Sequence, residues 1–122
     1  MEYWLRLAAY DLDTARALLA SGRDLPCAFW CHQVVEKLLK AHVVRSTGRV
    51  PPRTHDLVRL AAESAIDLDD RRREVLGRLG PLAILARYPA TDDPSSLVDH
   101  DVATRLVADC EEVDRWLRSI LG

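Results

Sequence analysis

The sequence predicts an all-α fold, an antiparallel up-and-down bundle of about five helices, four of them long and one short. Apolar residues recur at the spacing of a helix face along most of the chain. Short polar stretches with Gly or Pro separate these segments, and no segment has the pattern of a β-strand. The 122 residues fit one domain, 1–122, which is long enough to bury a core without disulfides or metal.

The first predicted helix runs from Glu2 to about Ala20. Ser21-Gly22 ends it, because Gly is common just after the C-terminus of a helix. Pro26 suits the first turn of the next helix. Since a short link between helices favours antiparallel neighbours, we expect the first two helices to form a hairpin.

The second predicted helix, 27–44, has the strongest pattern and contains the sequence FWCHQVVEKLLKAH. Its apolar face consists of Cys27, Cys31, Val34, Val35, Leu38, Leu39 and His42. Polar residues dominate the opposite face, which carries Gln33, Glu36, Lys37 and Lys40. Glu36 precedes Lys40 by four residues, the favourable order for an ion pair within a helix. This polar face is either part of a binding site or a solvated surface.

Loop composition, cap residues and apolar spacing also predict the elements after the second helix. The stretch RSTGRVPPRTH is the main predicted loop, and Thr54 is the expected N-cap of a short helix over 55–65. The next helix starts at Asp69 or Asp70 and extends to Ala86, with a kink or break at Gly80-Pro81, because an interior Pro removes a hydrogen bond. A final helix is predicted over 99–121, with Val102, Leu106, Cys110, Val113, Leu117 and Ile120 on its apolar face.

Composition excludes several classes of protein. The net charge of −2 gives no general basic field for coating DNA. The chain has no apolar run of bilayer length and no signal peptide pattern, so we expect a soluble, cytoplasmic protein without membrane contact. Cys27, Cys31 and Cys110 are expected to be free thiols. Cys27 and Cys31 lack a second ligand pair, and the chain lacks glycine-rich phosphate loops, so we expect no metal site and no cofactor.

Two stretches combine basic with aromatic or rigid residues. In Ala86-Arg87-Tyr88-Pro89, Arg can bind phosphate and Tyr can stack on a base. Alternatively, Arg87 only complements a helix C-terminus and Tyr88 packs on the bundle. In Arg49–His55, a proline-containing basic loop leads to a helix N-terminus. The alternative for this stretch is a simple linker.

Three motifs together carry a resemblance to a known family. The order and spacing of CHQVVEKLLKAHV, THDLVRL and ARYP resemble those of the HEPN domain (higher eukaryotes and prokaryotes nucleotide-binding), over nearly the whole chain. The resemblance implies a bundle of about five helices, usually a homodimer, encoded beside a minimal nucleotidyltransferase partner. Such pairs resemble toxin–antitoxin modules, and many members are metal-independent ribonucleases.

The nuclease signature of that family is an Arg, four to six residues, and then a His late in the chain. Arg49 and His55 have this spacing but lie early, in the proline-containing loop, where we expect poor preorganisation. Arg87 lies in the late position, yet His100 is too far along to complete the signature. The resemblance therefore implies a branch that binds nucleotide or RNA without nuclease activity.

The resemblance carries over eight nucleotide-binding candidates: His32, Gln33, Glu36, Lys37, Lys40, His55, Arg87 and Tyr88. Lys37, Lys40 and Arg87 would contact phosphate, and Tyr88 or His32 would contact the base. Two alternatives stay open. One is a metal-independent RNase toxin that uses Arg49 and His55, and the other is a non-catalytic adaptor that docks a partner protein.

Overall fold

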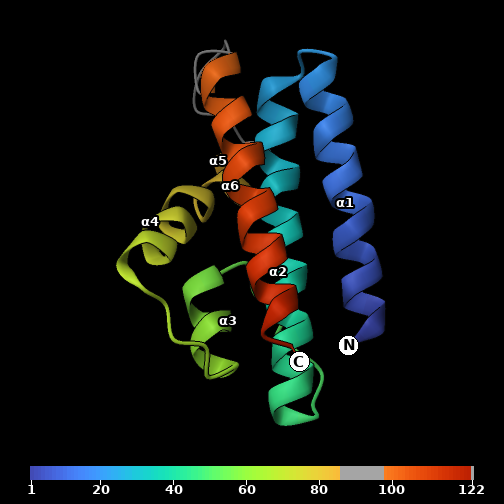
Figure 1. The fold of residues 1–122 in the computed structure, drawn as a ribbon, viewed down its shortest axis with the longest axis vertical. Helices are drawn as coiled ribbons and strands as arrows, with labels where there is room; N and C mark the ends of the chain where they lie inside the picture. Colours follow the sequence, from blue (N-terminus) through green and yellow to red (C-terminus); the bar gives the residue numbers. More distant parts are fainter. Residues whose placement is uncertain (86–97, 122) are drawn as a thin grey trace.

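The computed structural model describes residues 1–85 and 98–121 of the chain. These ranges contain α-helices and no β-strand, which confirms the predicted all-α bundle. The helices are α1 (Glu2–Ala20), α2 (Asp24–Thr47), α3 (Leu57–Glu63), α4 (Asp70–Leu79), α5 (Leu82–Leu85) and α6 (His100–Ser119). Figure 1 shows the three long helices side by side, with the short helices on one flank. Among the described helices, none combines the length and the apolar character needed to cross a membrane.

Helix α2 lies at the centre of the bundle. Each of the other described helices contacts it, and Leu38 and Val34 are fully buried. The polar face of α2 is covered as well, because α1 and the loop before α3 pack over it. Only 3% of Glu36 is exposed. The interpretation of this face as a solvated surface is therefore wrong.

The chain direction follows an up-and-down course (Figure 1). Helices α1 and α2 form the predicted antiparallel hairpin, closed by Gly22 with a positive φ of 74°. The return path is taken by α3, α4 and α5 in short pieces, so α6 runs parallel to α2. Three residue pairs along the two helices record this parallel course: Asp24 with His100, Cys31 with Cys110, and His42 with Leu117.

The helix ends differ from the prediction at α2 and α3. Helix α2 begins three residues before and ends three residues after the predicted range 27–44, so the first three residues of the predicted loop, Arg45 to Thr47, are helical. At α3 the difference is in the cap. Asp56, not Thr54, is the N-cap, because its carboxylate accepts the N–H of Arg59. The Thr54 hydroxyl instead accepts the N–H of Asp56 and forms the turn before the cap. The break at Gly80-Pro81 is confirmed, since α4 ends at Leu79 and α5 begins at Leu82.

The core is formed by apolar residues of the three long helices, with contributions from the short ones. Cys27, Cys31 and Cys110 lie within it as free thiols, as predicted. One core prediction was wrong: Ile120 is 44% exposed, and Leu121 is buried in its place. The physical reason is that α6 ends at Ser119, so the helical register no longer applies to the next two residues.

Candidate functional site

A buried carboxylate joins α2 to the loop that precedes α3. Oε1 of Glu36 accepts a hydrogen bond from Nδ1 of His55 at 2.6 Å, and Oε2 accepts one from Nζ of Lys40 at 3.2 Å. The Glu36 side chain is only 4% exposed. A carboxylate removed from water in this way requires partners for both oxygens, and the two contacts supply them. The contact with His55 therefore fixes the loop to the centre of the bundle, while Lys40, on α2 itself, binds the second oxygen.

His32 supports this arrangement from one turn earlier on α2. Its Nε2–H donates to the backbone carbonyl of His55 at 3.2 Å, because a carbonyl oxygen can only accept. The ring is completely buried, and burial lowers the pKa of His32 below its usual value. Its Nδ1 atom has no hydrogen-bond partner among the described residues. The buried ring therefore lies beneath His55 and cannot contact a surface ligand directly in this conformation.

The imidazole of His55 is the accessible end of the cluster. Its side chain is 59% exposed, and the bond to Glu36 occupies Nδ1. The carboxylate thereby sets the tautomer, so Nε2 is left as the atom that can exchange a proton or a hydrogen bond with a ligand. The poor preorganisation expected for the Arg49–His55 pair does not extend to His55 itself, because Glu36 holds its ring, a contact that the sequence does not show.

A largely apolar groove of about 360 Å³ opens beside His55, between the start of α3 and helix α4. Its lining residues are His55, Asp56, Leu57, Val58, Leu76, Gly77, Gly80 and Ala83. Gly77 leaves one wall bare, since a Cβ atom there would meet nothing within 4 Å. The volume lies at the small end of the range for small-molecule sites. Sequence reasoning missed Gly77 and Val58, because only the fold brings α3 and α4 together.

The two lysines carried over from the resemblance already have partners within the bundle. Lys37 forms a close ion pair with Asp11 of α1, and its side chain is 17% exposed. Lys40 binds Glu36 and lies over the ring of Trp4, with 5.4 Å between Nζ and the ring centroid. Gln33, the neighbouring candidate, is half-buried. Both ammonium groups thus help to hold α1 on α2, and neither is an isolated surface cation.

The other residues singled out in the sequence are Arg49, Arg87 and Tyr88. Arg87 and Tyr88 lie outside the residues that the structure describes. Arg49 is exposed and lines a different groove with Thr47 and Val50. The grooves that contain Arg49 and His55 share no lining residue, so the structure gives no support to an Arg49–His55 pair at one phosphate.

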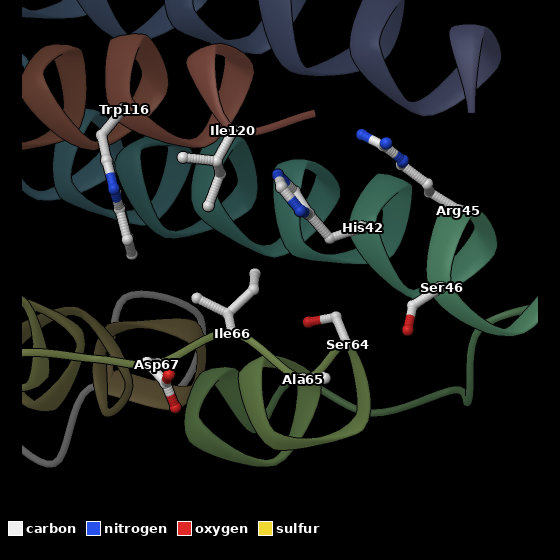
Figure 2. Close-up of a pocket in the computed structure, with 9 residues that line it drawn as sticks. All are labelled: His42, Arg45, Ser46, Ser64, Ala65, Ile66, Asp67, Trp116 and Ile120. Carbon is white, nitrogen blue, oxygen red and sulfur yellow. The ribbon is translucent and has the colours of Figure 1, made fainter. Parts of the chain in front are cut away.

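A third groove, of about 480 Å³, lies between the C-terminal parts of α2 and α6 and the end of α3 (Figure 2). Here Nε2–H of His42 donates to the carbonyl of Leu117 at 2.7 Å, and burial lowers the pKa of the ring. Arg45 and Trp116 also line the groove. None of the six predicted nucleotide-binding residues that the structure describes lines this groove. In residues 1–85 and 98–121, no three His, Cys, Asp or Glu side chains are placed to bind a metal ion.

The fold and the site together define an all-helical bundle with a histidine–carboxylate pair at the mouth of an apolar groove. Comparison with known families matches the HEPN domain over residues 1–120. The chain therefore belongs to the HEPN domain family, a family of nucleotide- and RNA-binding proteins.

Comparison with solved structures supports the fold. The crystal structure of TT1696 from Thermus thermophilus is similar to this chain, with a TM-score of 0.85. The sequence identity is 20%, and the match covers 97% of this chain and 95% of that chain. At this identity the likeness shows the fold alone. Comparison with curated proteins found no match.

Proposed function

We propose that this HEPN domain binds a nucleotide or an RNA end at the groove beside His55. The observation that carries the proposal is the hydrogen bond between His55 and the buried Glu36 at the mouth of an apolar groove. It provides one oriented, exposed polar atom next to apolar walls, which is the combination typical of small-molecule sites.

In this proposal the parts of the groove have different tasks. The bare wall at Gly77 and the exposed Val58 side chain would contact the flat face of a base. Nε2 of His55, which is unprotonated when Nδ1 carries the proton, would accept a hydrogen bond from a ribose hydroxyl. Ala83 lines the groove and lies only four residues before Arg87 in the sequence, so Arg87 and Tyr88 stay candidates for phosphate and base contacts. His32, Lys37 and Lys40 would support the site from within the bundle.

We further propose that the protein acts with a minimal nucleotidyltransferase in a toxin–antitoxin-type module. This part rests on membership of the HEPN family, together with the motif resemblance in CHQVVEKLLKAHV, THDLVRL and ARYP. Copurification of the two chains from a common expression host would test it. Recovery of each chain alone under gentle conditions would count against the module.

One observation favours a second function, a metal-independent ribonuclease. An exposed His whose Nδ1–H is held by a carboxylate is an arrangement that suits a general base. His55 could accept the proton of a ribose 2′-hydroxyl through Nε2, while Glu36 holds the ring. This function predicts RNA cleavage that continues in EDTA and is lost in His55→Ala. Intact RNA after prolonged incubation with folded wild-type protein would rule against it.

The groove itself can be tested by filling it. In Gly77→Leu, a side chain enters the open space beside His55, and replacing a mid-helix Gly should also strengthen α4. We expect calorimetric titration with ATP, GTP and a short RNA to show saturable binding to the wild type and none to this variant. Ala108→Leu is the matched control, because it fills a separate groove between α4 and α6. Equal affinity of the two variants would contradict the assignment.

A further inference from the structure

The groove between the C-terminal parts of α2 and α6 has the features of a second small-molecule site (Figure 2). Its volume of about 480 Å³ lies within the range of about 300–1,000 Å³ that is common for such sites. It shares no lining residue with the groove beside His55. Its walls come from the ends of α2, α3 and α6 and from the residues that follow α3. It is therefore a separate feature of the bundle.

Two buried polar side chains line the middle of this groove, and both are left with acceptor atoms. His42 is 6% exposed and Ser64 is 7% exposed. Because Nε2–H of His42 donates to the Leu117 carbonyl, Nδ1 of the neutral ring carries a lone pair, and it has no hydrogen-bond partner among the described residues. The Ser64 hydroxyl donates to the Leu60 carbonyl at 2.8 Å, which leaves its oxygen as an acceptor. A ligand that presents an N–H group at this point therefore matches both side chains.

The two ends of the groove carry opposite charges. Figure 2 shows Arg45 at one end and Asp67 at the other, with His42 and Ser64 between them. Both charged side chains are exposed, and neither has an ion-pair partner in the part of the chain that the structure describes. A ligand with a carboxylate at one end and an ammonium group at the other can therefore pair with both.

The rest of the groove wall is largely apolar. Ile66 and Trp116 are half-buried and Ile120 is exposed, so each contributes carbon surface to the groove. The guanidinium of Arg72 lies over the Trp116 ring, with 4.0 Å between Cζ and the ring centroid, which holds the ring in place before any ligand binds. Arg72 is also paired with Asp69 at 2.6 Å, so it does not neutralise the acidic end of the groove.

We propose that this groove binds a short peptide with free ends and apolar side chains, of the size of a dipeptide. The peptide carboxylate pairs with Arg45 and the ammonium group with Asp67. Between them the peptide N–H donates to His42 or Ser64, and the side chains pack on Trp116. A free amino acid fits less well, because it has no N–H left for the middle of the groove once its ammonium group is at the acidic end. Since the groove beside His55 is separate, this assignment and the nucleotide site can fail independently.

Calorimetric titration of the full chain with leucyl-leucine tests this site. The wild type is expected to show saturable binding, and Arg45→Gln and Asp67→Asn are each expected to weaken it by about tenfold or more. Arg49→Gln is the matched control, because Arg49 is also exposed but lines a different groove. All three substitutions are on the surface, and thermal unfolding confirms that each variant is folded. A folded wild type without saturable binding, or equal affinities of Arg45→Gln and Arg49→Gln, would overturn the proposal.

Blocking one end of the peptide at a time tests its orientation. The N-acetyl derivative lacks the ammonium group and the C-terminal amide lacks the carboxylate, so each should bind the wild type about tenfold more weakly or worse. Asp67→Asn should add little to the effect of acetylation, and Arg45→Gln little to that of the amide, because each pair of changes removes the same interaction. Additive losses would contradict the orientation. Free leucine should also bind about tenfold more weakly or worse, and an affinity equal to that of leucyl-leucine would contradict the need for a peptide N–H.

Discussion

The Nδ1 atom of His55 lies 2.6 Å from Oε1 of Glu36, although the first side chain is 59% exposed and the second only 4%. The contact connects the exposed imidazole ring of the candidate site to a buried carboxylate in the middle of the central helix. It joins the loop before α3 to α2, and the two residues are 19 positions apart in the sequence. The orientation of His55 is therefore set by the core of the bundle and not by the loop itself.

Replacement of Glu36 by Gln should destabilise the bundle. The amide provides one acceptor in place of two and carries no charge, so the Lys40 ammonium, whose side chain is 13% exposed, loses its counter-ion. We expect a loss of about 2–4 kcal/mol in the free energy of unfolding, measured with urea. Glu63→Gln, which breaks an exposed pair with Arg59, should cost less than about 1 kcal/mol. Equal losses in the two variants would contradict this account of Glu36.

Stability should fall as the pH falls through the range of His titration. Burial lowers the pKa of His32 and His42 in the folded state, while in the unfolded state both titrate near 6.5. Below that pH the unfolded chain binds protons that the folded chain does not, so unfolding becomes more favourable until the folded pKa is passed. Above it both states are neutral, and this contribution to stability is fully present.

The pH dependence can be assigned by removing one of the rings. Each His that is protonated only in the unfolded state contributes up to about 1.4 kcal/mol per pH unit to the slope. We expect His42→Gln to lower stability at neutral pH, because the bond to the Leu117 carbonyl is lost, and to flatten the slope between neutral and mildly acidic pH. Urea unfolding at several pH values measures both. An unchanged slope of unfolding free energy against pH would show that His42 does not contribute to the pH dependence of stability.

Ala65 offers a substitution that should stabilise the protein. It follows the C-cap of α3 with a φ of +56°, where a Cβ atom is unfavourable. Ala65→Gly should therefore raise the free energy of unfolding by about 0.5–1 kcal/mol, as read from thermal denaturation. Gly48 has a φ of +67° after α2, with open space around it. Gly48→Ala should thus lower stability by a similar amount. Changes of the same sign would contradict the backbone explanation.

The ion pair between Lys37 and Asp11 should matter mainly when only one partner is removed. Asp11→Leu leaves a poorly exposed ammonium without a counter-ion and should cost about 2–4 kcal/mol. The double variant Asp11→Leu with Lys37→Met replaces both charges by apolar groups of similar size and should recover most of that loss. Urea unfolding of the wild type, Asp11→Leu, Lys37→Met and the double variant gives the coupling free energy. Additive effects would show that the two side chains do not depend on each other.

The helices could be predicted from the sequence, because their periodicity and end signals are local. The stop at Gly22 and the break at Gly80-Pro81 both follow from residues within a few positions. The N-cap of α3 was harder, since Thr54 and Asp56 are both good cap residues two positions apart. The choice depends on where the loop enters the helix, and the tie from His55 to α2 determines that.

The candidate site could be predicted only in part. The sequence indicated His32, Glu36 and His55 but not that they form one cluster, because contacts between a helix and a distant loop leave no periodic signal. The ion pair between Glu36 and Lys40 follows from their four-residue spacing and is confirmed. The contacts of Lys37 with Asp11 and of Lys40 with Trp4, both on α1, become visible only once the hairpin is packed.

The central claim is that His55 presents a ligand-binding atom at the mouth of the groove. His100 provides a close control, because its side chain is also 59% exposed and its Nδ1 also contacts a carboxylate, that of Asp24 at 2.8 Å. The most direct measurement is the affinity of a short single-stranded RNA for the wild type, His55→Ala and His100→Ala, with thermal unfolding recorded for each. The account predicts a loss of about tenfold or more in His55→Ala alone. Equal affinities for the two His variants, both folded, would contradict it.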